Sequence, residues 1–143
     1  MAGYDDSKVI NGTYGYLWLD GELIQEIQSV KATITPKTET VSQSGQLVDG
    51  SKVTGLECKG ELKTNKINSR WINLMSESLK KGKQQSFTII SKLEDPSNGG
   101  SERIKLTGCV FSELTLIDWE LKKLTEDSLN FNFKDWDILD SIE

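Results

Sequence analysis

Few residues of this chain could do chemistry, and histidine is absent from all 143 positions. Histidine is the commonest general base, the usual activator of serine and cysteine nucleophiles, and the commonest metal ligand. Paired carboxylates or a lysine could still support catalysis, but no spacing in the sequence points to either. We therefore expect no enzymatic activity, no catalytic residue, no cofactor and no metal site.

Three short motifs have a chemical interpretation and a plainer structural one. Asn11-Gly12-Thr13 matches a glycosylation sequon but favours a turn, and the glycine-rich stretch 12–15 precedes a strand, whereas a phosphate loop precedes a helix. Asp135, Asp137 and Asp140 lack the glycine and the distal glutamate of a calcium loop. The structural interpretation is favoured for all three motifs.

Two cysteines and four tryptophans complete the candidates. Cys58 and Cys109 are far apart and lack Cys-x-x-Cys spacing, which favours reduced, buried thiols over a disulfide or a metal site. The tryptophans could offer a sugar-binding platform, but burial in a core or an interface is favoured for each; they are Trp18, Trp71, Trp119 and Trp136.

The charge and the hydropathy pattern argue against two classes of partner. A formal net charge of −5 disfavours nucleic-acid binding, because such a surface repels phosphates. The lysines of the stretch 80–83 are more typical of the last turn of a helix than of a phosphate-binding patch. No apolar run is long enough to cross a membrane, and residues 1–6 do not resemble a secretory signal, so we expect folding in the cytoplasm.

The elements that must position these residues are mostly strands, because apolar residues alternate with a period of two. Leu17 and Leu19 lead into Asp20-Gly21, which predicts a tight type I′ hairpin turn. The next strand is expected to end at Pro36, since proline cannot donate to a central ladder. Further strands are expected around residues 56–62, 87–93, 102–111, 114–119 and 129–133, followed by an acidic, aromatic tail.

Residues 37–52 form a long polar connection in which the apolar residues are scattered; they are Val41, Leu47 and Val48. Connections of this length are usually functional or disordered. Two interpretations remain open: a floppy hairpin loop, or a loop that orders only against a neighbouring subunit.

The period changes to helical spacing in one place. It predicts a helix over about 69–81, with Asn68 as its N-cap and Gly82 as the residue that ends it. The helix is expected to pack its apolar stripe on the end or flank of a barrel.

One strand carries apolar residues on both faces, with Ile104, Leu106 and Val110 opposite Cys109 and Phe111. Such a strand needs cover from the helix, a second sheet or another subunit. The sum is a mainly β protein, a sandwich or barrel of about seven strands with one flanking α-helix, and a single domain over residues 1–143.

Three groups of residues, in order and over nearly the whole chain, resemble the tail tube (core tail) proteins of contractile phages, defective prophages and phage-tail-like bacteriocins. None is catalytic. They are Ile10-Asn11-Gly12 with Gly15-Tyr16-Leu17-Trp18-Leu19-Asp20-Gly21-Glu22; Leu79-Lys80-Lys81-Gly82 with Phe87-Thr88 and Gly100-Ser101-Glu102-Arg103-Ile104-Lys105-Leu106; and Phe131-Asn132-Phe133-Lys134-Asp135-Trp136-Asp137.

The resemblance implies a ring-forming subunit: six copies form a ring, and rings stack into a hollow tube. The implied partners are the chain itself, a contractile sheath, and baseplate (tube-initiator) and terminator proteins at the ends. The implied location is the bacterial cytoplasm during assembly and then the inner tube of a virion or extracellular tail particle. The acidic balance would suit a negatively charged lumen along which DNA slides.

The resemblance also assigns the candidate contact residues. The connection 37–52 matches the place where tube proteins extend a loop onto the adjacent ring, so Val41, Leu47 and Val48 are expected at the ring-to-ring contact. Cys109 and Phe111 are candidates for contacts between strands of neighbouring subunits.

Two alternatives remain. A secretion tube of the type VI kind would share the fold, and a monomeric carbohydrate-binding β-sandwich would use the tryptophans. Infectious phage, defective prophage and bacteriocin are equally compatible with the sequence.

Overall fold

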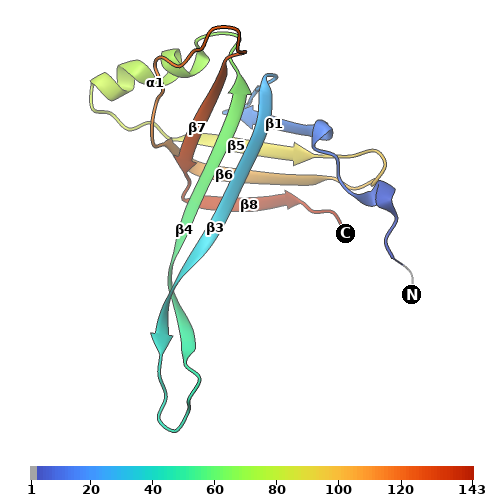
Figure 1. The fold of residues 1–143 in the computed structure, drawn as a ribbon, viewed down its shortest axis with the longest axis vertical. Helices are drawn as coiled ribbons and strands as arrows, with labels where there is room; N and C mark the ends of the chain where they lie inside the picture. The colour runs from blue at the N-terminus through green and yellow to red at the C-terminus, as the bar shows by residue number, and fades with distance from the viewer. Residues whose placement is uncertain (1–2) are drawn as a thin grey trace.

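The computed structural model describes residues 3–143 as antiparallel strands with one α-helix at the end of the molecule (Figure 1). Two short 3-10 helices, η1 and η2, precede the first strand. The elements are η1 (Asp6–Lys8), η2 (Gly12–Tyr14), β1 (Gly15–Leu19), β2 (Glu22–Leu23), β3 (Ile27–Val41), β4 (Gly50–Asn65), α1 (Arg70–Lys80), β5 (Phe87–Leu93), β6 (Glu102–Phe111), β7 (Glu126–Asn132) and β8 (Asp135–Asp140).

The strands form two sheets that share β6. The hydrogen-bonded order is β2-β1-β5-β6-β7-β4-β3, and β8 also pairs with β6. The first part of β6 lies between β5 and β8, whereas its last two residues pair with β7. Figure 1 shows the two groups of strands crossing steeply, with β3, β4 and β7 in one group and β5, β6 and β8 in the other. The expected mainly β sandwich or barrel is confirmed.

A bulge in β6 explains why this strand is apolar on both faces. Phe87 pairs with Cys109 and Ile89 pairs with Leu106, so β6 contains an extra residue at this point. Gly108 adopts φ +67° there, a conformation that glycine tolerates without strain. The bulge reverses which side chains face inward.

The core contains both Cys109 and Phe111, and Cys109 is 0% exposed. Their side chains are therefore covered by the chain itself. Contact of this part of β6 with a neighbouring subunit stays a prediction, while the side chains of Cys109 and Phe111 lie in the subunit's own core because the bulge turns them inward.

An aromatic cluster joins the helix to both sheets. The centroid of the Phe111 ring lies 5.4 Å from the ring centroid of Trp71 in α1. It lies 5.5 Å from that of Phe87 in β5 and 6.0 Å from that of Phe131 in β7. Trp71 and Met75, one turn apart, are the buried residues of α1. The predicted helix thus packs its apolar stripe on the barrel, and Gly82 follows it at φ +68°, as the sequence indicates.

The predicted turn at Asp20-Gly21 is present, whereas the predicted end of a strand at Pro36 is not. Asp20 and Gly21 both adopt positive φ angles and join β1 to β2, which confirms the predicted hairpin turn. Pro36 does not end its strand: it pairs with Leu56 inside β3. Because β3 lies at the edge of the sheet, one side of its backbone needs no intrachain hydrogen bonds, and proline is tolerated there.

Three segments differ from the expected boundaries. Pairing continues to Val41 and Gly50, so much of the expected loop 37–52 is a two-stranded ribbon and only residues 42–49 lie beyond the last pair. Residues 113–125 contain no strand, although 114–119 were expected to form one. The expected acidic tail is strand β8, because its Trp136 packs against the core.

Candidate functional site: surfaces for assembly

Two of the side chains with possible chemistry, those of Asp140 and Asn11, make structural contacts. Asp140 forms a 2.9 Å ion pair with Arg103 of β6. The Oδ1 atom of Asn11 accepts a hydrogen bond from Thr13 N at the start of η2, as expected of a turn. Between residues 3 and 143, no group of three or more histidine, cysteine, aspartate or glutamate side chains is arranged to hold a metal ion.

Both cysteines are free thiols, as predicted, but they differ in burial. Burial raises the pKa of the Cys109 thiol to about 11, with a smaller contribution from the negative charge of Asp20. Cys109 is therefore protonated at neutral pH and is a poor nucleophile. Cys58 is half-buried and packs against the core.

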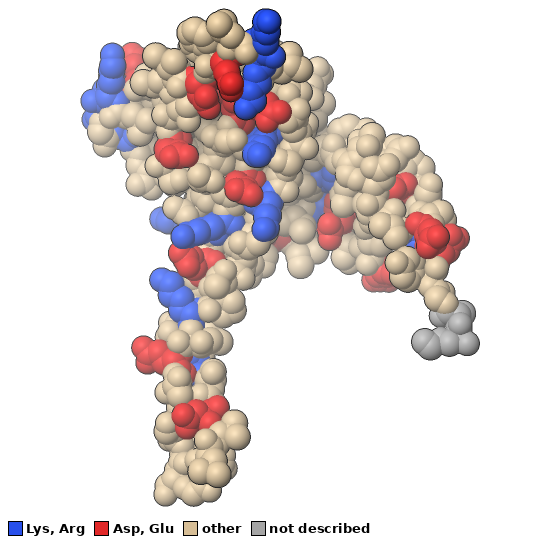
Figure 2. Space-filling model, in the orientation of Figure 1, with Lys and Arg blue, Asp and Glu red and all other residues tan. Residues whose placement is uncertain are grey.

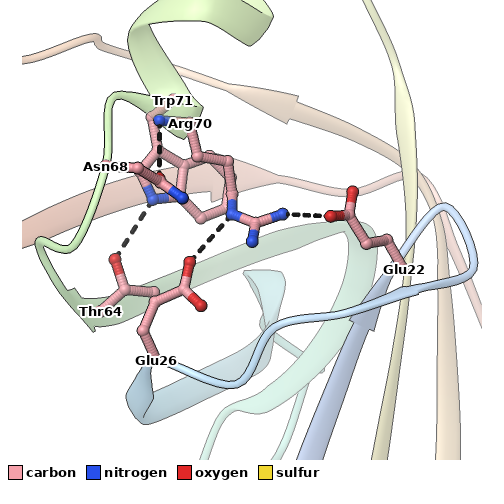
Figure 3. A network of polar contacts seen from close by, with 6 residues as sticks. All are labelled: Glu22, Glu26, Thr64, Asn68, Arg70 and Trp71. Atoms are coloured by element: carbon pink, nitrogen blue, oxygen red, sulfur yellow. Dashed lines mark hydrogen bonds and ion pairs between the residues drawn. The ribbon is translucent and has the colours of Figure 1, made fainter.

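A polar network fastens the start of α1 to the barrel (Figure 3). Arg70 donates from Nε to Glu26 Oε1 at 2.9 Å and from Nη1 to Glu22 Oε1 at 2.8 Å. These hydrogen bonds, first that to Glu22 and then that to Glu26, raise the pKa of Arg70 against the opposing effect of burial. Trp71 donates from Nε1 to Thr64 Oγ1 at 3.2 Å. The network has the geometry of a structural clamp, because these three hydrogen bonds join the first turn of α1 to β2, to β4 and to the segment before β3.

The ribbon of β3 and β4 extends far beyond the barrel and ends in a short turn (Figure 1). We call residues 42–49 the ribbon tip. Its Leu47 is fully exposed and Val48 is 83% exposed, and Val41 at the base of the tip is 41% exposed. The three residues singled out by sequence thus lie together at the far end of the ribbon.

Residues 113–125, the connection between β6 and β7, form a second apolar surface, here called the connecting loop. Five of its large side chains are between 60% and 90% exposed: Leu116, Ile117, Trp119, Leu121 and Leu124. Sequence reasoning missed this surface because it assigned part of the segment to a strand. The available signal was the density of apolar residues without sustained alternation.

An open cleft separates the two sheets next to the free edge of β3. Its volume is about 730 Å³, and it is lined by apolar residues of both sheets. They include Val30, Ala32 and Ile34 of β3, Ile104 of β6, and Trp136 and Ile138 of β8. Val30, Ile34 and Ile138 remain partly exposed, so this part of the core is incomplete within the described chain.

The other face of the β3-β4-β7 sheet is polar. Cross-strand pairing aligns Thr33, Lys59 and Asn132 in one row and Lys31, Glu61 and Asn130 in the next. Positive and negative side chains are interspersed along the ribbon and on the body above it (Figure 2). This face is suited to water rather than to packing.

Among residues 3–143, no helix has both the length and the apolar character needed to cross a membrane.

Comparison with known proteins gives one consistent family. Residues 2–140 match the family described as phage tail tube protein. The chain is 30% identical over 133 residues to the phage-like element PBSX protein XkdM of Bacillus subtilis (strain 168), covering 92% of this chain and 90% of that protein. It is 29% identical over 138 residues to the uncharacterized protein YqbM of the same strain, covering 95% and 94%.

Solved structures share the fold at low sequence identity. A chain of the PVC sheath-tube complex, from an extracellular contractile injection system in its extended state, superposes with a TM-score of 0.70 at 12% identity, covering 97% of this chain and 100% of that chain. A chain of the anti-feeding prophage tube-terminating cap gives a TM-score of 0.69 at 13% identity, covering 99% and 95%. The fold, and the match of the family over nearly the whole length, lead to one conclusion: the chain belongs to the phage tail tube protein family and is a structural subunit of a tail tube.

Proposed function

We propose that six copies of this single-domain subunit form a ring and that rings stack into the hollow inner tube of a contractile tail or tail-like particle. The observation that carries this proposal is the β3-β4 ribbon, which projects from the barrel and ends in exposed Leu47 and Val48. These two exposed side chains, carried on a long projection, have no packing role within their own subunit, and the projection has the reach to contact another copy.

The ring contact is proposed at the free edge of β3 and the adjoining cleft. The outer edge of β3 carries unpaired backbone groups along a 15-residue strand, and such edges invite pairing with another chain. A strand of the neighbouring copy would continue the sheet around the lumen. Its apolar side chains would also cover Val30 and Ile34, completing the part of the core that one copy leaves open.

The polar face of the β3-β4-β7 sheet is the proposed lumen wall. Its charges are nearly balanced, since four lysines accompany three glutamates: Lys31, Lys37, Lys59 and Lys63 with Glu57, Glu61 and Glu126. This balance argues against the expectation of a strongly acidic lumen. Interspersed charges would still let a solvated cargo pass, because no continuous positive stripe is present to hold phosphates.

The remaining partners follow from the family and from the neighbours that share the fold. We propose a sheath outside the tube, an initiating baseplate protein at one end and a terminator at the other. Assembly would take place in the bacterial cytoplasm before the particle is released. Binding between copies is sufficient to form the tube, so this proposal includes no catalytic step.

Negative-stain electron microscopy of the purified protein at low and high concentration tests the proposal. Rings, and hollow tubes that lengthen with concentration or after addition of a nucleating baseplate protein, are expected. A strictly monomeric protein under both conditions would contradict the proposal and would favour a monomeric binding module, to be tested by tryptophan fluorescence with sugars.

Two variants locate the contact. Deletion of residues 40–49 should leave a folded subunit that no longer forms tubes. Leu47→Ser with Val48→Ser should have the same effect, since both side chains are exposed and contribute little to folding. Val9→Ser is the matched control, because Val9 is also exposed but lies in the N-terminal segment. Tubes that persist in both ribbon variants would contradict the assignment of the tip.

A further inference from the structure

The connecting loop, residues 113–125, lies at the opposite end of the molecule from the ribbon tip. Lys66 N, just after β4, donates a 3.0 Å hydrogen bond to Thr125 O, the last residue of the loop. The ribbon tip begins beyond the pair of Val41 and Gly50, at the other end of the same strands. A 15-residue strand spans roughly 50 Å, and Figure 1 shows the connection passing over the α1 end while the tip forms the opposite end.

Apart from Leu114, which packs against the core, the large apolar side chains of the loop lie outside the core. The loop's five exposed large side chains fall within nine residues, and none belongs to the buried core cluster. Soluble monomers seldom expose a contiguous apolar patch of this kind, and a larger one marks an interaction site. The ribbon tip is the other segment that exposes adjacent large apolar residues to this degree, with Leu47 and Val48.

Charge does not pair the two surfaces, since acidic residues outnumber basic ones in both. Asp49 is the single charged residue of the tip. The loop carries Lys122 and Lys123 together with Glu113, Asp118 and Glu120, and Glu120 is engaged by Lys123 in a loose 3.8 Å ion pair. Lys122 adopts φ +64°, an unfavourable angle for a residue with a side chain, in an exposed turn.

We propose that the connecting loop of one copy receives the ribbon tip of a copy in the adjacent ring, with Leu47 and Val48 against Trp119 and Leu121. This inference rests on the proposed tube function and names the partner surface of the tip. The two surfaces are different and lie at opposite ends of one chain. Their contact is therefore heterologous and does not close, so it generates an open stack of rings.

Trp119 provides a native probe of this contact. It is 69% exposed in the single subunit, so its burial on stacking should move its fluorescence emission to shorter wavelength. We expect the shift to accompany tube formation in the natural protein and to be much reduced in Trp119→Phe, which keeps an apolar ring and should still form tubes. Tubes whose emission change is the same with and without Trp119 would overturn the inference.

A pair of charge substitutions tests the same contact without a spectroscopic probe. Leu121→Asp with Leu124→Asp should abolish stacking while leaving single rings, since both side chains are exposed and the ring contact lies elsewhere. Tyr4→Asp with Val9→Asp is the matched control at two exposed N-terminal positions and should stack normally. If natural protein forms tubes and the loop variant stacks equally well, the loop does not receive the tip. If natural protein forms neither rings nor tubes, the proposed function itself fails.

Discussion

Gly60 of β4 lies directly beneath the ring of Phe131 of β7, its partner across the two strands. A Cβ atom built on Gly60 would lie 2.3 Å from Cζ of that ring, closer than any real contact. The ring of Phe131 is nearly fully buried. Its centroid lies 6.0 Å from the ring centroid of Phe111 and 6.3 Å from that of Phe133. The bare backbone of Gly60 is thus part of the core surface.

Gly60→Ala should destabilise the fold by about 1–3 kcal/mol, because the added methyl group forces Phe131 out of its position. Chemical denaturation of the single subunit measures this change. Phe131→Leu in the same chain should recover part of the loss, since a smaller side chain makes room for the methyl group. Additive costs of the two substitutions would contradict the steric explanation.

Arg70→Met should cost about 3–5 kcal/mol of unfolding free energy, because it leaves the carboxylate of Glu26, whose side chain is only 5% exposed, without its cation. Thermal denaturation of Arg70→Met and of Glu22→Gln measures the loss of unfolding free energy in each. The side chain of Glu22 is 70% exposed, so that loss should stay below about 1 kcal/mol. Equal effects of the two substitutions would show that burial of the Glu26 pair does not matter.

Gly108→Ala should destabilise the fold by about 1–2 kcal/mol from backbone strain alone, because Gly108 adopts φ +67°. The new methyl group would also meet Cβ of Lys134 at 3.1 Å. Gly12→Ala is the control, since it has open space and no positive φ, and should change stability by less than about 0.5 kcal/mol. Urea denaturation of both variants measures the two changes in unfolding free energy. If Gly108→Ala leaves the unfolding free energy unchanged, the bulge relaxes to accommodate the methyl group.

Alkaline pH should weaken the fold through Cys109. Its pKa is about 11 in the folded chain against an ordinary value of 9.0, so the folded state favours the protonated thiol. The stability that this contributes is fully present below about pH 9 and is lost as the pH rises towards 11, by up to about 1.4 kcal/mol per pH unit.

Unfolding free energies measured from pH 8 to 11 in the natural protein and in Cys109→Ala test this prediction. The variant is less stable at pH 8, because it lacks a buried side chain, but it should lose less stability as the pH rises. Parallel pH profiles would exclude the thiol as the titrating group.

Features that depend on neighbours along the chain can be predicted from local sequence. Asp20-Gly21 forms its turn because both positions require positive φ angles, and Gly82 follows the helix for the same reason. Alternation located most strands, and helical spacing placed Trp71 and Met75 on the buried side of α1. The absence of histidine and of catalytic spacing gave the expectation of a structural role, in agreement with the family.

Features that depend on distant strands follow from packing in three dimensions. Pro36 continues β3 because this strand is at an edge, a position that no local pattern reveals. Cys109 and Phe111 point inward because one bulge at Gly108 reverses the inward face, and that bulge exists only relative to β5. The apolar residues of the connecting loop look in sequence like those of a strand. Whether an apolar side chain is covered by its own chain or left exposed depends on packing in three dimensions, and residue type alone does not record it.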